Sequence, residues 1–323
     1  MPIDRGLAAS FLCGVRQMDI KEINYLLTIQ KCGSITKAAE ELFISQPALS
    51  KYLKSVETQV GAQLFSRIGK ELVPTYIGSR YLAYAAQIAH LQSDWNTEHR
   101  ELLGEKKGVL SLAMPPMRSA CIMPHVLPRF YEKYPNVQVI VMEESHLVKK
   151  HWMSLRDEID IVIYSDTGPQ STLMHENLGT EEVILIMSQT HPLAGRGESR
   201  PGCRYPWFDL KLLKNESFAL NPPDQTTGRI SARLLESAGF TPNVLLYTFN
   251  TEIPIHLAAA GTAIAFAPET YVKKLNSDNQ LKCFSVGTPN IEITLYALYE
   301  KGRYLPSYTK HFFELVREHM LSM

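Results

Sequence analysis

Apolar residues recur at helical spacing in the first part of the chain. Ile20, Ile23 and Leu27 lie three and four residues apart, with polar residues between them, so the pattern predicts a helix from about residue 18. Gly33 ends this pattern, and Ser34 can cap a second helix. One face of that second helix carries the apolar residues Ile35, Ala38, Ala39 and Leu42.

A third helix is predicted after a short turn. Ser45 can cap it, and Pro47 is tolerated in its first turn. Its buried stripe consists of Leu49, Leu53, Val56 and Val60, whereas its opposite face carries Gln46, Ser50, Lys51 and Lys54. A short helix, a tight turn and a longer helix with a polar, basic front predict a helix-turn-helix, whose second helix enters the major groove of DNA.

The residue types on this front suit base and phosphate contacts. Glutamine can pair with adenine through two hydrogen bonds, and serine can bind either partner of a base pair. Lys51 and Lys54 can meet phosphates or guanine. Two short apolar runs then flank Gly69 and predict a β-hairpin wing, which would place Arg67 and Lys70 beside the DNA backbone or minor groove.

A long heptad pattern follows the wing. Its apolar positions alternate in steps of four and three, at Ile77, Tyr81, Tyr84, Ile88, Leu91 and Trp95. A helix over residues 76–103 would be roughly 40 Å long. A stripe of that length exceeds what a small bundle covers, so we expect it to pack against the same helix of a second chain. The alternative is packing against its own domain.

From about residue 108 the pattern alternates between strands and helices. Val109–Ala113, Val137–Glu143 and Ile159–Ile163 are predicted strands, separated by helices at Pro124–Tyr134 and Leu147–Asp157, which indicates a parallel sheet. A second set follows, with predicted helices at Arg229–Ala238 and Pro254–Ala260 and a final helix at Ser307–Met320.

Two such sets predict two similar α/β lobes with a cleft between them. We expect lobe 1 to comprise about 108–179 and 288–323 and lobe 2 about 180–287, with the crossings near Gly179 and Gly287. The domain order is then an extension at 1–17, a winged helix-turn-helix at 18–75, a linker helix and hinge at 76–107, and an effector domain at 108–323.

Ligands of open α/β sheets bind beyond the carboxyl ends of the strands. The strand ends and helix starts of the two lobes therefore nominate a site for a small polar or carboxylate-bearing effector. Thr226 or Thr227 would cap a helix whose free N–H groups favour an anion, and Arg118 could pair with a carboxylate or lie at the surface. The full set of candidates is Pro115, Arg118, Ser119, Ser145, His146, Asn221, Thr226, Thr227, Asn250 and Thr251.

Composition constrains these interpretations. Lys plus Arg and Asp plus Glu each total 33 among the 323 residues, so a DNA interaction must rest on a local surface. Residues 18–80 contain eight Lys or Arg and six Asp or Glu, a balance of only +2, so a plain three-helix bundle with solvated lysines fits the periodicity as well.

The cysteines and the N-terminal residues bear on the compartment. The five cysteines are far apart, which argues against a disulfide framework or a zinc cluster and fits a reducing cytoplasm; Cys203 is an incidental residue or a peroxide-sensing thiol. Residues 1–17 are interpreted as a disordered extension or as the result of translation assigned from an upstream start codon. The alternative is a weak signal peptide. The sequence contains no uninterrupted stretch of about eighteen apolar residues, so no transmembrane helix is predicted.

The specific residues of the first domain go beyond periodicity. Residues 33–50, which include Ser45-Gln46-Pro47-Ala48-Leu49-Ser50, closely resemble the LysR-type transcriptional regulators. So do Leu64-Phe65-Ser66-Arg67 and Pro74-Thr75-Tyr76-Ile77-Gly78, although Tyr25 stands where the family usually has phenylalanine. Residues 155–163 and 259–268 resemble two motifs of the family's effector domain.

The resemblance implies a winged helix-turn-helix joined by a linker helix to a two-lobed, periplasmic-binding-protein-like domain. It implies that Gln46, Pro47, Ser50 and Lys51 contact bases or backbone, with Arg67 in the wing and Thr36 near a phosphate. It also implies a dimer, or a tetramer of two dimers, on an inverted-repeat operator, together with contact to RNA polymerase.

Two other classes of protein share parts of this pattern. A solute-binding protein would use the same two-lobed domain, but it requires export and leaves the helix-turn-helix and the heptad pattern unexplained. A small-molecule enzyme is the second alternative, although GxSxG, HExxH, P-loop and GxGxxG motifs are all absent from the sequence. We therefore expect a regulator without a cofactor or catalytic residues.

Overall fold

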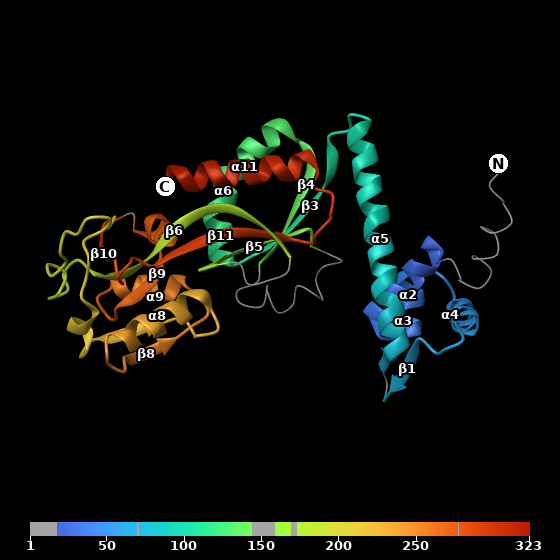
Figure 1. Cartoon of the computed structure of the whole chain (residues 1–323), viewed down its shortest axis with the longest axis horizontal. Coiled ribbons are helices and arrows are strands. Elements are labelled where there is room, and N and C mark those ends of the chain that lie inside the picture. Colours follow the sequence, from blue (N-terminus) through green and yellow to red (C-terminus); the bar gives the residue numbers. More distant parts are fainter. Residues whose placement is uncertain (1–17, 70, 144–158, 169–172, 277) are drawn as a thin grey trace, which may run out of the picture. The chain divides into compact units, whose positions relative to one another are not determined.

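A computed structural model describes residues 18–69, 71–143, 159–168, 173–276 and 278–323 (Figure 1). The predicted extension at 1–17, the predicted helix Leu147–Asp157 and the candidates Lys70, Ser145 and His146 lie outside the described residues. The chain forms two units, Met1–His99 and Arg100–Met323, which are described separately below.

The N-terminal unit begins with three helices, α2 (Ile20–Cys32), α3 (Ile35–Glu41) and α4 (Gln46–Val60). The predicted caps are present, because the side chain of Ser34 accepts a hydrogen bond from Lys37 N and that of Ser45 accepts one from Ala48 N. Gly33 and Gly61 end α2 and α4 in the left-handed conformation. The strands β1 (Phe65–Ile68) and β2 (Glu71–Pro74) then form an antiparallel hairpin.

The long helix α5 spans Tyr76–Leu102. Its first turn touches the start of the hairpin so closely that a Cβ at Gly78 would lie 1.8 Å from the carbonyl oxygen of Leu64. Leu82, Ala85 and Ala86 are the next buried residues of α5. One face of this helix therefore belongs to the core of the N-terminal unit.

The C-terminal unit contains a seven-stranded mixed sheet. Six strands follow the order β10-β6-β11-β5-β3-β4, and β9 also pairs with β6. The strands β3 (Lys107–Met114), β4 (Asn136–Glu143) and β5 (Ile161–Asp166) are parallel, whereas β6 (Met174–Ser188) and β11 (Glu292–Tyr299) run antiparallel to their neighbours. The three strands for which a parallel arrangement was predicted are therefore parallel, and the strands β6 and β11 extend the sheet with antiparallel pairing.

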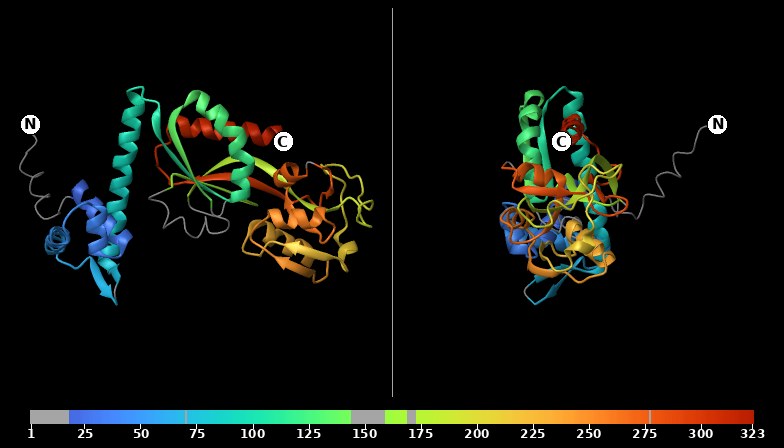
Figure 2. Two further views of the ribbon diagram at one scale, coloured as in Figure 1. Left: turned by 180° about the vertical axis from the view of Figure 1, so that it is seen from behind. Right: turned by 90° about the vertical axis from the view of Figure 1, so that its left-hand side faces the viewer.

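The strand β6 connects two halves of the C-terminal unit. Its residues 174–182 pair with β11, and its residues 183–188 pair with β9 (Ala265–Pro268) and β10 (Leu281–Phe284). At one end of the sheet, α6 (Pro116–Lys133) and α11 (Ser307–Ser322) enclose a core that includes Phe130 and Phe312 (Figure 2).

The other half carries three further helices, α8 (Thr226–Ser237), α9 (Glu252–Ala259) and α10 (Glu269–Leu275). It also contains the 3₁₀-helix η1 (Leu210–Leu213) and the parallel pair β7 (Ser217–Leu220) and β8 (Asn243–Tyr247). Two apolar clusters, centred on residues such as Phe218 and Ile255, fill this half.

Two helix starts differ from the sequence prediction in a way that affects the site. Helix α6 begins at Pro116 rather than at Pro124, because its apolar face from Met117 to Phe130 is buried continuously and Pro124 lies inside the helix. Ser119 is consequently helical and buried. Helix α8 begins at Thr226 rather than at Arg229.

Candidate functional site

The front of α4 is open to solvent. Leu49, Leu53 and Val56 are buried behind it. Ser50 is half-buried, and the other described candidates for DNA contact are all exposed: Thr36, Ser45, Gln46, Pro47, Lys51, Lys54 and Arg67. Within the described residues, the polar, basic surface predicted from the sequence is therefore available to a partner.

Sequence reasoning missed Phe43, which lies in the turn between α3 and α4. Its side chain is 96% exposed, and its backbone has φ of 54°, a left-handed conformation that non-glycine residues other than Asn and Asp rarely adopt. The signal available in the sequence was its place in a tight turn two residues before the cap Ser45. An aromatic ring thus stands in solvent next to the start of α4.

The heptad residues of α5 are divided between two environments. Ile77, Tyr84, Leu91 and Trp95 are exposed, and Ile88 is half-buried. Tyr81 instead donates a hydrogen bond to Glu22 of α2 and packs against the core of its own unit. The exposed members leave an apolar stripe on the helix.

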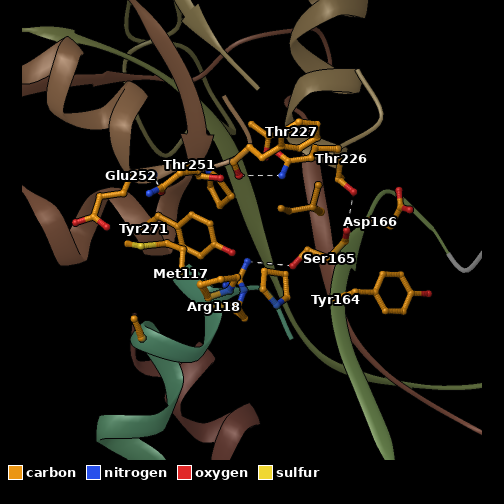
Figure 3. A pocket seen from close by; sticks show the side chains of 18 of the residues that line it. Met117, Arg118, Tyr164, Ser165, Asp166, Thr226, Thr227, Thr251, Glu252 and Tyr271 are labelled. Carbon is orange, nitrogen blue, oxygen red and sulfur yellow. Dashed lines mark hydrogen bonds between the residues drawn. The ribbon is translucent and has the colours of Figure 1, made fainter. Parts of the chain in front are cut away.

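The C-terminal unit contains a cavity of about 790 Å³. Its walls are the start of α6, the end of β5, the starts of α8 and α9, and the region around α10 (Figure 3). Six predicted residues line it: Pro115, Arg118, Thr226, Thr227, Asn250 and Thr251. Ser119 and Asn221 are not part of the lining; Asn221 instead donates from Nδ2 to the carbonyl oxygen of Thr248 at 2.8 Å.

Several lining residues were not predicted. They include Glu143, Tyr164, Ser165, Asp166, Asp224, Gln225, Arg229, Phe249, Glu252 and Tyr271. Ser165 and Asp166 were missed because the predicted strand ended at Ile163, whereas β5 continues to Asp166. Glu252 was missed because the predicted helix began at Pro254 rather than at Glu252.

Arg118 is buried at the base of the cavity, with only 1% of its surface exposed. It forms an ion pair with Glu181 of β6, donates from Nη2 to Ser165 Oγ at 3.0 Å, and places its guanidinium carbon 4.6 Å from the centre of the Tyr271 ring. Burial opposes its charge, but attraction to Glu181 prevails and raises the pKa of Arg118. Its Nη1 atom has no hydrogen-bond partner.

The start of α8 has a different cap from the one predicted. Gln225 occupies the cap position without a side-chain hydrogen bond to the helix, so neither Thr226 nor Thr227 is the cap. The Thr226 hydroxyl donates to the carbonyl oxygen of Ser165 at 3.0 Å (Figure 3). Arg229 pairs with Asp166 at 2.7 Å. These two contacts join α8 to the end of β5 beside the cavity.

The described residues contain no group of three or more His, Cys, Asp or Glu side chains placed to hold a metal ion. The Cys203 thiol donates to Asn290 Oδ1 at 3.4 Å. None of the described helices is long and apolar enough to span a bilayer.

Comparisons with known proteins cover both units. Residues 20–79 match the family model of the bacterial regulatory helix-turn-helix proteins of the lysR family, and residues 103–321 match that of the LysR substrate-binding domain. YcgK of Bacillus subtilis, an HTH-type transcriptional regulator, is 28% identical over 313 residues, which cover 93% of this chain and 94% of YcgK. BsdA of the same organism is 29% identical over 259 residues, covering 74% and 87% of the two chains.

Solved structures show the same fold. A full-length OxyR variant from Pseudomonas aeruginosa superimposes with a TM-score of 0.70 at 18% identity, over 94% of this chain and 96% of the other. Full-length CbnR in complex with its target DNA gives a TM-score of 0.56 at 18% identity, over 94% and 100%. The matched domains establish that the chain belongs to the LysR family of transcriptional regulators, with a helix-turn-helix DNA-binding domain and an effector-binding domain.

Proposed function

We propose that the exposed front of α4 reads base edges in the major groove of an operator. The observation that carries this proposal is the division of α4 into a buried stripe and an open polar, basic face. Gln46 and Ser50 would contact bases, whereas Lys51, Lys54 and Arg67 would contact phosphates or guanine. The DNA-bound structure of CbnR, which has the same fold, supports this arrangement.

We further propose that the exposed stripe of α5 pairs with the same helix of a second copy. Ile77, Tyr84, Leu91 and Trp95 are apolar, exposed and spaced as a heptad pattern requires. A two-fold dimer presents two α4 helices, and therefore favours an operator with inverted repeats. Assembly into tetramers and contact with RNA polymerase remain part of this proposal.

The effector would bind in the cavity of the C-terminal unit. The start of α8 offers N–H groups without a side-chain cap, and such a helix start attracts a carboxylate or another anionic group. Ligand binding would favour one arrangement of the two halves around β6 and so bias the spacing of the DNA-binding domains. Under this proposal, residues 18–75 bind DNA, residues 76–107 form the linker helix and hinge, and residues 108–323 bind the effector.

A gel-shift titration with the DNA upstream of the protein's own gene tests the DNA contacts. Lys51→Ala is expected to reduce the slope of log affinity against log salt by about 1, because one phosphate contact is lost. Gln46→Ala is expected to cost about 1–3 kcal/mol on the preferred site and less on other DNA. Lys211→Ala, an exposed change on η1, is the matched control.

The two outcomes that count against the proposal are distinct. If Lys51→Ala and Lys211→Ala give the same salt dependence, the front of α4 does not bind phosphate. If the full-length protein shows no preference for its upstream DNA over unrelated DNA at any salt concentration, the operator proposal fails.

A further inference from the structure

The last turn of α5 is attached to the start of α11. Glu101, the penultimate residue of α5, lies in the C-terminal unit. Its carboxylate accepts a hydrogen bond from the backbone N–H of Ser307, the first residue of α11, at 2.8 Å, and another from the hydroxyl of Tyr304. Pro306 provides no side-chain cap to α11, so the carboxylate of Glu101 supplies a partner for one of its first N–H groups and meets the positive end of the helix dipole.

The environment of Glu101 favours its ionised form. The side chain is half-buried, and burial favours the neutral acid, but the hydrogen bonds from Ser307 and Tyr304 outweigh burial and lower the pKa of Glu101. Hydrogen bonds to a charged acceptor are roughly twice as strong as those between neutral groups. Two such bonds therefore hold the end of α5 more firmly than an uncharged side chain at this position could.

The chain that leaves α5 is also held by α11, at the beginning of β3. A Cβ at Gly108 would lie 2.8 Å from the hydroxyl oxygen of Tyr308 and 2.9 Å from Cε1 of its ring. The side chain of Tyr308 is buried, and its hydroxyl donates to the carbonyl oxygen of Val109 at 3.3 Å. The connection from α5 to β3 is therefore fixed at one end through Glu101 and at the other through Tyr308, both by contacts with the start of α11.

One strand leads from the effector cavity to this joint. Ile293, near the start of β11, lines the cavity and packs in the core of the half that contains α8. Ala297 of the same strand packs in the core of the half that contains α6 and α11. In the loop after β11, Arg303 pairs with Asp160, and the next residue is Tyr304. A change in the arrangement of the two halves can therefore reach the joint through a continuous series of packed and paired residues.

We propose that Glu101 is a positioning residue for DNA binding, which fixes the end of the linker helix α5 to the effector domain. Through this joint α5 follows the movements of α11, and the DNA-binding domains change their spacing as a result. The inference rests on the proposed function, in which effector binding biases that spacing. It assigns the transmission to one carboxylate and its two donors, on Tyr304 and Ser307.

Hydrogen exchange of the full-length protein tests whether Glu101 holds the joint. In Glu101→Ala both acceptor oxygens are lost, and we expect the backbone N–H of Ser307 to exchange at least tenfold faster than in the wild-type protein. Glu101→Gln retains one acceptor oxygen, and Tyr304→Phe removes a donor from the other side, so both should give a smaller increase. Glu236→Ala on α8 and Tyr131→Phe on α6 change exposed side chains of the same types and should leave this exchange unchanged.

The geometry of bound DNA tests whether the joint sets the spacing of the DNA-binding domains. The probe is the DNA upstream of the protein's own gene, with a donor dye at one end and an acceptor dye at the other. Measured at saturating protein, the energy transfer between the dyes reports the path of the bound DNA and does not depend on the fraction of active protein. We expect Glu101→Ala to lose at least half of the change in energy transfer that the wild-type protein produces, whereas Glu236→Ala should match the wild type.

The outcomes separate the two steps of the proposal. Equal exchange at Ser307 in Glu101→Ala and Glu236→Ala would show that the carboxylate does not hold the joint, which overturns the proposal. Faster exchange together with wild-type energy transfer would show that the joint does not set the spacing, which also overturns it. If the wild-type protein itself does not bind the upstream DNA, the proposed function fails instead, and the exchange comparison still decides whether Glu101 fixes the end of α5.

Discussion

Removing the cation that pairs with Asp166 should destabilise the C-terminal unit measurably. Asp166 is completely buried at the end of β5, and Arg229 of α8, with a side chain 29% exposed, pairs with it at 2.7 Å. In Arg229→Gln the buried carboxylate keeps its hydrogen bond from Thr167 N at 2.8 Å but loses this charge partner. The contact between α8 and β5 then depends on Thr226 alone among the bonds described above.

The size of the effect follows from the exposure of the two partners. Breaking a fully buried ion pair costs roughly 3–5 kcal/mol, whereas a hydrogen bond to a charged group contributes about 1.5–3 kcal/mol. Because Arg229 is partly solvated, we expect a loss of about 2 kcal/mol. In a domain of roughly 200 residues this corresponds to a decrease in Tm of about 4–8 °C.

The effect should also be asymmetric. Asp166→Asn leaves Arg229 free to turn towards water, so it should cost less than Arg229→Gln, which leaves a carboxylate buried. The double variant should therefore resemble Asp166→Asn rather than the sum of the two. Arg233→Gln, an exposed change one turn along α8, is the control.

Thermal unfolding of the full-length variants at neutral pH provides the measurement, with the coupling taken from the double-mutant cycle. Equal Tm values for Arg229→Gln and Arg233→Gln would refute the reasoning. So would a coupling free energy below about 0.5 kcal/mol, because neighbours in one ion pair should not behave additively.

Three further changes test other parts of the structure. Gly78→Ala places a Cβ 1.8 Å from Leu64 O and should cost about 3 kcal/mol, with a clear fall in the Tm of the N-terminal unit. Gly168→Ala, whose Cβ would have no atom of the described residues within 4 Å apart from its chain neighbours, should not lower Tm, and equal effects would contradict the close contact at Gly78. Phe43→Asn replaces an aromatic residue in the left-handed conformation with one that adopts this conformation more readily. The free energy of unfolding should rise by about 0.5–1 kcal/mol and Tm should rise with it, whereas a lower Tm would show that the exposed ring is stabilising. Burial and the nearby His125 lower the pKa of His319, so the unfolded chain binds the proton more readily and stability should decline as the pH falls below about 6.5. His319→Gln should flatten the dependence of Tm on pH between 7.5 and 5.5, and an unchanged slope would exclude this histidine as its source.

The helix-turn-helix could be predicted closely because its signals are local. A cap such as Ser45 bonds to an N–H three residues away, and Gly61 ends α4 through its own backbone conformation. The apolar stripe of α4 likewise needs no distant partner to be recognised. The exposed candidates of this helix were therefore found from the sequence alone.

The C-terminal unit was predicted less accurately where distant residues decide the structure. The start of α6 at Pro116 depends on burial of its apolar face, and Pro124, which usually marks a first turn, lies within the helix. The start of α8 depends on Thr226 and Arg229 meeting the end of β5, more than sixty residues earlier in the chain. Periodicity within a short window cannot carry this information, so the predicted cap was wrong.

Arg118 shows why the charge of the cavity had to come from the structure. Its place after a strand nominated it as a partner for a ligand carboxylate, but the sequence could not show that Glu181, from the middle of β6, already balances its charge. Both arginines of the described lining are paired with buried carboxylates, Arg118 with Glu181 and Arg229 with Asp166. Residue types at strand ends therefore located the cavity, whereas the pairing of those residues decides which chemistry it can hold.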